Sequence, residues 1–393
     1  MKVLIVTANF RAEGVNPWLL DDLSSELVRS GHRVDVLVHS PTAPRPRGQQ
    51  EIGGATVLSV GAERAPRTSV GKLVSYLATA ARVHTVGWRW LARNHYDLCI
   101  YPSIGAFSFG LPARLRRRGA VSTLLFVMWD FFPVHQLDIG RIRAGALSGA
   151  LKRIERAAIQ RADVIATMSP ANERFLRAYH RDLRARSVTI PPWAADEPGA
   201  PVPKRERFSV IFGGQLARGR GVDTLVDAAV LLLAAGADVD VIIAGSGPDE
   251  DHLRAYAAEQ GASNVEFTGG LPREQYRTML RSCHVGVAVT VAGVTPPSFP
   301  SKIVEYCANG VPSIVSVEES SDAGELVEAH GAGLAVRAGS PQSIADAITS
   351  LATEHRDGIL EARAARARAL FDEELSVRIA AERMTREAGA PPI

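Results

Sequence analysis

Apolar and polar residues along the chain form two kinds of segment. Continuous apolar runs, such as Lys2–Ala8 and Val121–Val127, are typical of strands buried on both faces of a parallel sheet. Segments with apolar residues three and four positions apart, such as Trp18–Arg29, are typical of helices, and Gly31 is placed to end that helix. This alternation predicts parallel strands joined by right-handed helical crossovers.

The same pattern runs through both halves of the chain. Besides the segments named above, the first half predicts strands at Val34–Val38, Leu98–Tyr101 and Val164–Thr167 and helices at Val70–Arg93 and Ile142–Arg161. The second half predicts strands at Phe208–Phe212, Asp240–Ala244, Val265–Thr268, Val285–Val289 and Ser313–Val317. Its predicted helices are Gly221–Ala235, Asp249–Gln260, Gln275–Arg281, Ser301–Asn309, Pro341–Ala352 and a tail that reaches about Arg386.

The pattern breaks once, at residues 190–203, which hold five prolines. Prolines disfavour both helix and sheet, so we expect a linker there. We predict an N-terminal domain at 1–190, a linker at 191–205, a C-terminal domain at 206–370 and a helical tail at 371–393. The predicted fold class is α/β, with two Rossmann-like, doubly wound parallel-sheet domains that face each other across a cleft. Ligands of such folds bind beyond the carboxyl ends of the strands.

The composition is that of a folded protein, with 46% hydrophobic and 22% charged residues, and 393 residues suit two domains. Cys99, Cys283 and Cys307 form no C-x-x-C pair, so we expect neither a disulfide framework nor a zinc site. Met1–Phe10 lacks the features of a signal peptide, and no apolar stretch approaches the ~18 residues that span a bilayer. We therefore expect a cytoplasmic protein, with peripheral contact to the inner face of the cell membrane as its closest approach to lipid.

Charge changes this picture, because it is unevenly distributed. Residues 1–205 contain 29 Lys and Arg against 16 Asp and Glu, whereas residues 206–393 contain 16 against 26. The first half therefore suits an anionic partner, although a solvated, arginine-rich surface is the alternative. The helix at Ile142–Arg161 is basic and amphipathic, which suits an anionic membrane surface, but its apolar face could equally pack on the sheet. We expect no nucleic-acid partner.

The loop Gly213–Gly221 joins a predicted strand to a predicted helix. Glycines such as Gly214 and Gly221 let the backbone approach a ligand, and the following helix N-terminus favours an anion. Arg218 and Arg220 add positive charge. The loop suits a diphosphate, although it matches neither the P-loop nor the G-x-G-x-x-G motif and could be an ordinary turn.

Two further segments of the second half carry candidate chemistry. Gly245 and Gly247 lie in another strand-to-helix turn, which could form a wall for a nucleotide or be a plain turn. Ser301 is predicted to cap the next helix, and Lys302 and Glu305 share a face of its first turn. Glu305 could accept hydrogen bonds from two vicinal hydroxyls and Lys302 could offset phosphate charge, or the two could form a surface ion pair.

In the first half, Asp130 and His135 follow the predicted strand Val121–Val127 and lie among large apolar residues. This placement suits contact with a sugar, although a lone Asp or His is more often structural. Asp238 and Asp240 spell D-x-D, a metal-holding pattern, but here the motif leads into a strand, so we expect no metal there.

With these segments in order, the chain resembles retaining glycosyltransferase family 4, which has the GT-B architecture. The likeness runs nearly end to end and is strongest from Phe208 to Pro312. The family's phosphate loop matches Gly214–Gly221, with the family's Lys replaced by Arg220, which keeps the charge, and its Arg replaced by Gln215, which does not. The form of the Phe299–Tyr306 segment is similar to that of a subgroup that builds bacterial surface polysaccharides.

The resemblance implies roles for several more residues. Gly245–Pro248 matches the family's G-x-G-P turn, and Thr268 lies in a match to a turn near the base. The second of the family's paired glutamates, which holds the ribose, matches Glu305, whereas the first falls on Pro297. Trp129–Pro133 is similar to an aspartate-containing D-L-W-P stretch, with Asp130 in place. Gly14 matches the loop that reaches the donor phosphates.

The activity implied by the resemblance is transfer of a hexosyl or N-acetylhexosaminyl group, with retention, from a nucleotide-sugar donor, UDP-linked, to a lipid-linked or saccharide acceptor in polysaccharide or glycoconjugate biosynthesis. Arg220 and Lys302 would stabilise the departing diphosphate, with no metal and no cofactor, and Asp130 or His135 would orient the acceptor or donor sugar. Two alternatives stay open, because fold alone does not decide function. One is a sugar-nucleotide epimerase or phosphorylase of the same fold, and the other is a non-catalytic partner subunit that binds nucleotide sugars.

Overall fold

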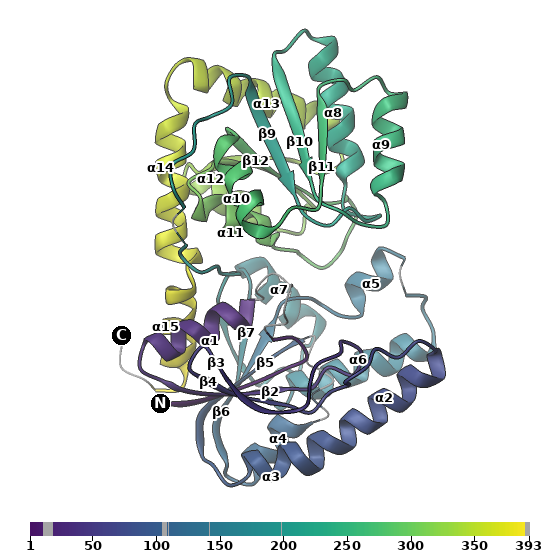
Figure 1. Ribbon diagram of the computed structural model, residues 1–393, viewed down its shortest axis with the longest axis vertical. Helices are drawn as coiled ribbons and strands as arrows, with labels where there is room; N and C mark the ends of the chain where they lie inside the picture. Colours follow the sequence, from purple (N-terminus) through teal and green to yellow (C-terminus); the bar gives the residue numbers. More distant parts are fainter. Residues whose placement is uncertain (11–18, 104–107, 109, 141, 198, 390–393) are drawn as a thin grey trace. The chain divides into compact units, whose positions relative to one another are not determined.

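The computed structural model describes all residues except 11–18, 104–107, 109, 141, 198 and 390–393, and it divides into two compact units (Figure 1). One unit contains Met1–Ala195 and Val377–Ile393, and the other contains Asp196–Ser376. Whereas the sequence suggested a separate helical tail, the last helix α15 (Val377–Glu387) packs beside α1 (Leu19–Arg29) in the N-terminal unit. It does so because its apolar side chains enter that unit's core: Val377, Ala380, Ala381 and Met384.

The N-terminal unit is built on an eight-stranded sheet with the order β3-β4-β2-β1-β5-β6-β7-β8. All neighbouring strands run parallel except the edge strand β3, which is antiparallel to β4. The strands are β1 (Lys2–Thr7), β2 (Arg33–Val38), β3 (Gly48–Ile52), β4 (Ala55–Ser59), β5 (Tyr96–Pro102), β6 (Val121–Met128), β7 (Val164–Thr167) and β8 (Arg186–Thr189).

The hairpin of β3 and β4 was not predicted from the sequence. Its turn, Gly53-Gly54, takes left-handed φ angles of 58° and 80°, which glycine adopts without strain. Strand β3 is exposed along most of its length and is polar, so it lacks the apolar pattern that marks the buried strands.

Helices cover both faces of this sheet: α1, α2 (Ser69–Arg82), the π-helical turn η1 (Val83–Gly87), α3 (Trp88–Leu91), α4 (Leu111–Arg117), α5 (Val134–Asp138), α6 (Ala146–Ile159) and α7 (Pro170–Tyr179). The alternation along β1 explains the layering, because Val3 and Ile5 enter one core and Leu4 and Val6 enter the other.

The single helix predicted over Val70–Arg93 is observed as α2, η1 and α3 in succession.

The C-terminal unit contains a six-stranded, wholly parallel sheet with the order β11-β10-β9-β12-β13-β14. The strands are β9 (Phe208–Gly213), β10 (Val239–Ala244), β11 (Val265–Gly269), β12 (Val285–Val289), β13 (Ser313–Val317) and β14 (Gly333–Arg337). The helices are α8 (Val222–Ala234), α9 (Glu250–Glu259), α10 (Arg273–Ser282), α11 (Ser301–Ala308), α12 (Ala323–Ala329), α13 (Pro341–Arg356) and α14 (Leu360–Leu370), followed by the π-helical turn η3 (Phe371–Leu375).

This strand order places the start of the second sheet at its centre. Strand β9 lies between β10 and β12, so the chain leaves it first toward one edge of the sheet and later toward the other. Ligands of doubly wound folds bind at such a switch point, beyond the carboxyl ends of the two central strands. The loop after β9 is therefore the expected position of a ligand site.

The predicted fold class of two doubly wound α/β domains is confirmed. The cleft between them stays a prediction. None of the helices within the described part of the chain is long and apolar enough to cross a membrane.

Candidate functional site

The loop from Gly213 to Gly221 begins at the switch point of the C-terminal sheet and ends at helix α8. Gly214 has a φ of 148°, and a Cβ added there would lie 2.8 Å from Cε of Lys302. The missing side chain at this position therefore leaves room for the lysine. Two segments singled out in the sequence, the glycine loop and the start of α11, thus meet in space.

Lys302 is a partly buried cation in an unusual setting. Its ammonium lies 4.7 Å from the centroid of the Phe212 ring, which is a cation–π contact. Burial, reinforced by the positive charge of Arg220, lowers the pKa of Lys302 to about 8. No acidic side chain among the described residues forms an ion pair with Lys302. An anion bound here would relieve the repulsion between the two cations.

Two helix N-termini meet the same loop. Helix α8 starts after Gly221, whose φ is 70° and where a Cβ would lie 2.6 Å from the carbonyl oxygen of Thr290, at the end of β12. Helix α11 starts after Pro300. In neither helix does the side chain of the N-cap residue accept a hydrogen bond from the first-turn amides. Such N–H groups carry partial positive charge and bind anions.

The expected cap at Ser301 is wrong. Pro300 occupies the N-cap position of α11, and Ser301 is the first residue of the helix, with an exposed side chain. Proline has no side-chain oxygen and cannot cap, so no N-cap side chain takes the first amides of α11, although the Ile303 amide donates to the Pro300 carbonyl at 3.1 Å. Ser301 nevertheless stays at the expected end of the helix, beside Lys302.

The exposed side chains of Gln215 and Arg218 extend the loop toward solvent. Arg220 is also exposed, and its charge acts on Lys302. Of the two arginines proposed to bind phosphate, Arg220 is therefore the one that the structure brings to Lys302.

The second glycine turn, at Gly245 and Gly247, serves the packing of the loops. A Cβ at Gly245 would lie 1.8 Å from the carbonyl oxygen of Gly214, and one at Gly247 would lie 2.0 Å from that of Leu216. The Gly214 amide donates to the Ala244 carbonyl at 2.9 Å, and the Leu216 amide donates to the Ser246 carbonyl at 3.0 Å. Glycine is thus required here because two backbones touch, which fixes the shape of the first loop.

The third loop of the series continues this stack. The Gly245 amide donates to the carbonyl of Gly269 at 2.9 Å, and the Thr268 hydroxyl donates to the same carbonyl at 3.0 Å. The carboxyl ends of β9, β10 and β11 are therefore linked by direct hydrogen bonds from loop to loop. Thr268 lies at the outer end of this series, two strands away from the loop that meets Lys302.

Glu305 pairs with a residue that the sequence analysis missed. Its carboxylate accepts a hydrogen bond from Nε of Arg277 at 2.7 Å, and Arg277 also pairs with Glu197. The Arg277 side chain is only 3% exposed, whereas that of Glu305 is 21% exposed. The buried guanidinium of Arg277 thus orients Glu305. Glu305 is therefore not an ion-pair partner of Lys302. Only spatial packing joins α10 to α11, so no sequence spacing could have revealed the pair.

In the N-terminal unit, Asp130 and His135 follow β6, as predicted. Both are partly buried, and the buried Nδ1 of His135 has no hydrogen-bond partner among the described residues. Trp129, directly before Asp130, packs its ring 6.1 Å from that of Trp193. Gly14 lies outside the residues that the structure describes.

A second residue missed in the sequence is Glu155, on α6. Its side chain is 2% exposed, and neither carboxylate oxygen has a hydrogen-bond partner within the described part of the protein. Burial, and then the negative charge of Asp130, raise the pKa of Glu155 to about 8, while Lys152 acts in the opposite direction. The signal was present, since Glu155 is the only acidic residue between Ile139 and Ala162 and shares a helix face with Leu151 and Ile159.

Helix α6 only partly fits either interpretation made from its sequence. Its buried residues are Ser148, Glu155 and Ile159, so the face on the sheet is less apolar than expected. Leu147 and Ile154, by contrast, are 69% and 41% exposed. Neither complete packing of the apolar face nor a continuous exposed stripe is observed on α6.

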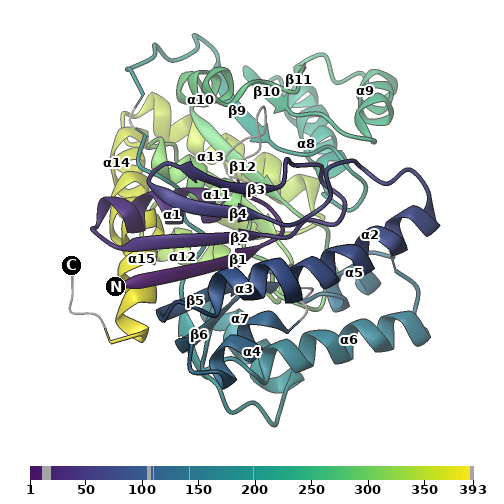
Figure 2. The ribbon, with the colours of Figure 1, turned by 60° about the horizontal axis from the view of Figure 1, so that its bottom comes forward.

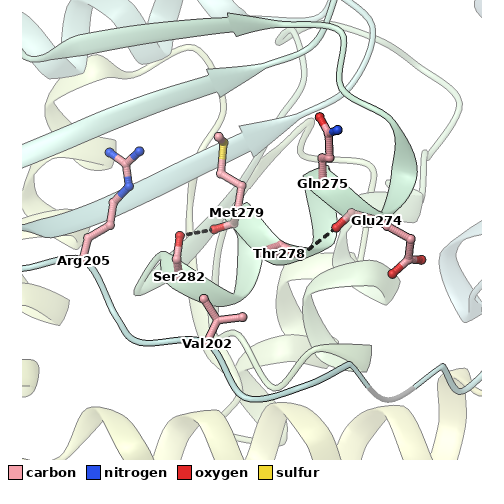
Figure 3. A pocket seen from close by; sticks show the side chains of 7 residues that line it. All are labelled: Val202, Arg205, Glu274, Gln275, Thr278, Met279 and Ser282. Carbon is pink, nitrogen blue, oxygen red and sulfur yellow. Dashed lines mark hydrogen bonds between the residues drawn. The ribbon is translucent and has the colours of Figure 1, made fainter.

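A hollow of about 380 Å³ lies on the C-terminal unit, and Figure 3 shows the side chains that line it. It is lined by α10 and the segment before β9: Val202, Arg205, Glu274, Gln275, Thr278, Met279 and Ser282. None of the residues proposed to bind a ligand lines it. The hollow is therefore not part of the site at the end of β9.

The D-x-D pair has a structural role. Arg207 forms ion pairs with Asp238 at 2.6 Å and with Asp240 at 2.8 Å, at the start of β10. This is the amino end of the strand, opposite to the end where the glycine loops lie.

Comparison with known proteins gives a consistent result for both units. Residues 196–368 match the family model described as glycosyl transferases group 1, and residues 18–193 match the glycosyl transferase 4-like domain. Among curated proteins, the probable glycosyltransferase WbjE of Pseudomonas aeruginosa is 22% identical over 221 residues, which are 53% of this chain and 54% of WbjE. The chain thus matches only about half the length of this curated relative.

Solved structures share the fold over the whole chain. Sucrose-phosphate synthase from Thermosynechococcus elongatus has a TM-score of 0.73 and 16% identity, with 98% of each chain covered. Anabaena Alr3699/HepE, solved in complex with UDP and glucose, has a TM-score of 0.68 and 16% identity, with all of both chains covered. At these identities the likeness shows the fold, which is GT-B.

Proposed function

Because this chain belongs to the group 1 glycosyltransferases with the GT-B fold, we propose that it is a retaining enzyme. It moves a hexosyl or N-acetylhexosaminyl group from a UDP-linked donor to a lipid-linked or saccharide acceptor. The product would enter polysaccharide or glycoconjugate biosynthesis. The fold of HepE, which was solved with UDP and glucose, supports the choice of donor.

One observation carries the proposal: positive charge is concentrated at the switch point of the C-terminal sheet. Lys302, Arg220 and the N-termini of α8 and α11 surround the loop at Gly214. A nucleoside diphosphate is an anion of the kind that such positive charge and helix N-termini bind. The same groups would act more strongly during the reaction, since the diphosphate gains charge as the bond to the sugar breaks.

The chemistry assigned to these residues is stabilisation of the leaving group. The acceptor hydroxyl oxygen forms the new bond to the anomeric carbon, the bond from that carbon to the diphosphate breaks, and the acceptor proton leaves with the phosphate oxygen. Lys302 and Arg220 supply fixed charge, and the amides of the glycine loop supply hydrogen bonds. Burial and then repulsion from Arg220 lower the pKa of Lys302, and a bound diphosphate would offset that repulsion.

Glu305 is proposed to bind the ribose of the donor. Its carboxylate is held in one orientation by the buried guanidinium of Arg277, and part of it remains exposed. A carboxylate can accept hydrogen bonds from two vicinal hydroxyls. Pro297, at the position of the family's other glutamate, cannot make this contact, so the donor sugar would need a different partner.

Asp130, His135 and Glu155 are proposed to serve the sugar or the acceptor from the N-terminal unit. Each offers a group for hydroxyls: a carboxylate at Asp130, a buried and unpartnered Nδ1 at His135, and a buried carboxyl at Glu155. A buried polar atom without a partner is costly, and a bound hydroxyl would satisfy it.

The test is a turnover assay on the full chain with a panel of UDP-sugars, each with and without lipid-linked or saccharide acceptors. We expect release of UDP that depends on the acceptor, and a product with the anomeric configuration of the donor in NMR spectra. An epimerase would change the sugar without releasing UDP. A binding subunit would bind UDP-sugars and release nothing, and either result would overturn the proposal.

A further inference from the structure

Helix α2 carries a stripe of large apolar side chains that no part of the described chain covers. Val70, Leu73, Val74 and Leu77 are 72%, 61%, 58% and 64% exposed. Their spacing of three and four residues places all of them on one face of the helix. Figure 2 shows α2 along the outside of the N-terminal unit. The other exposed large apolar side chains in the described residues form no such run: Val86, Leu147, Ile154, Leu231, Leu233 and Ile359.

The stripe belongs to a well-anchored helix. The Thr68 side chain caps α2 by accepting a hydrogen bond from the Gly71 amide at 3.0 Å. On the other side of the helix, Thr79 is fully buried and the Ser75 hydroxyl donates to the carbonyl of Pro41. The helix is therefore held to the unit by one face and presents the other. An apolar stripe maintained on a fixed helix marks a surface for contact.

The charge around α2 identifies the kind of partner. Residues 64–96 contain six Lys and Arg and no Asp or Glu. Arg64 and Arg67, before the helix, and Arg89, after it, are exposed. A second copy of this chain would bring the same positive charge against itself, which opposes docking of the face on its own image. The face of α2 is instead complementary to a partner with an apolar interior and a negatively charged surface.

We infer that α2 is an interfacial helix that inserts its apolar stripe into an anionic lipid surface. Its 14 residues are too few to span a bilayer, so the helix would lie in the plane of the interface. Basic residues before and after the stripe would meet lipid phosphates. The sequence pointed to α6 for this role, but the stripe of α6 is interrupted and partly packed, so α2 is the principal contact. This inference does not depend on the transfer reaction.

The test is co-sedimentation of the full chain with lipid vesicles, either neutral phosphatidylcholine or the same lipid mixed with phosphatidylglycerol, at low and high salt. The wild type should pellet with the anionic vesicles at low salt and less so at high salt. The double variant Leu73→Ser/Leu77→Ser should lose on the order of tenfold in partition coefficient. The matched control Leu231→Ser/Leu233→Ser, on the exposed face of α8, should pellet as the wild type does.

Three outcomes would overturn the inference. They are a wild type that stays in solution with anionic vesicles at low salt, an α2 variant that pellets as well as the wild type, and a dimer in sedimentation velocity that the α2 variant abolishes. Unchanged circular dichroism would show that the variant is folded, as expected for exposed positions. Calorimetry with UDP separates this result from the proposed function, since lipid binding should change in the α2 variant while UDP affinity does not.

Discussion

The side chains beyond the carboxyl ends of the two sheets differ in charge and in the ligand groups that they suit. Beyond the C-terminal sheet, glycines bring the backbone close and Lys302 and Arg220 supply positive charge. Beyond β6 in the N-terminal sheet, Asp130 and Glu155 supply carboxyl groups and His135 an imidazole. The first set suits a diphosphate and the second suits hydroxyl groups. The same doubly wound frame thus supports two chemistries, because function depends on the loops after the strands.

The two ends also differ in how they are made rigid. The C-terminal loops are locked to one another by backbone hydrogen bonds from Gly214 to Ala244 and from Gly245 to Gly269. The carboxyl of Glu155, in contrast, is buried without a hydrogen-bond partner among the described residues. The loops around Gly214 and Lys302 are therefore rigid before a ligand binds, and we call them the cradle. The N-terminal unit instead holds buried polar groups whose hydrogen bonds a ligand could complete.

The largest effect is expected from loss of charge in the cradle. Lys302→Ala or Arg220→Ala should lower kcat/KM roughly 30- to 1,000-fold. This corresponds to a loss of about 2–4 kcal/mol of transition-state stabilisation. Steady-state kinetics measures it, with Arg254→Ala on α9 as a matched control, because that arginine pairs with Glu250 on its own helix and contacts Phe267 on β11. Near-normal turnover of both variants would remove the assignment of the cradle to the diphosphate.

A change of comparable size is expected in the N-terminal unit as the pH changes. Because the pKa of Glu155 is raised to about 8 in the folded state, the folded protein keeps a proton that the unfolded chain releases near pH 4.5. Stability should therefore fall as the pH rises from about 4.5 to 8, by on the order of 3 kcal/mol. Urea unfolding at several pH values measures it.

The variant Glu155→Gln, which stays neutral, provides the comparison. It should lose less unfolding free energy than the wild type over the same pH range. Parallel pH profiles for the two proteins would mean that Glu155 does not hold its proton in the folded state.

A smaller effect is expected from the contact between the glycine loops. Gly245→Ala would place a Cβ 1.8 Å from the carbonyl oxygen of Gly214, so the first loop must shift, at a cost of about 1–3 kcal/mol. The midpoint temperature of thermal unfolding and the affinity for UDP should both fall. Gly149→Ala on α6 is the control, because an added Cβ there meets nothing within 4 Å. Equal behaviour of the two variants would show that the loops do not depend on this close approach.

The smallest effect is expected at Glu305. Glu305→Gln keeps the size of the side chain but weakens the pair with Arg277 and the proposed contact with the ribose, so UDP should bind about 5- to 30-fold more weakly, or 1–2 kcal/mol. Calorimetry with UDP and with inorganic diphosphate tests the position of the contact. Only UDP should lose affinity, and equal loss for both ligands would contradict a role at the ribose.

The sequence predicted the fold well where the pattern is regular. The strands Val164–Thr167, Val285–Val289 and Ser313–Val317 were predicted with the observed bounds, since they are apolar and buried. The polar edge strand β3 and the π-helical turn η1 were missed, because neither has a marked hydrophobic period. An exposed strand such as β3 lacks the burial that makes a pattern visible.

The candidate site divides in the same way. Gly214, Arg220 and Lys302 could be singled out because loops after strands and the starts of helices can be read from the sequence. The pair of Glu305 and Arg277 joins residues on different helices, and the exposed stripe of α2 looks in sequence like the apolar face of any helix. Partners and exposure depend on packing, which the local pattern does not contain.

The cradle at Gly214 and Lys302 is proposed to bind the diphosphate of a UDP-linked donor. Calorimetric titration of the wild type and of Lys302→Ala with UDP and with uridine isolates the contribution of the diphosphate. We expect UDP to bind the wild type at least tenfold more tightly than uridine, as a charge-assisted contact implies, and this difference to disappear largely in the variant. Equal binding of UDP and uridine by the wild type, or an undiminished preference for UDP in Lys302→Ala, would contradict it.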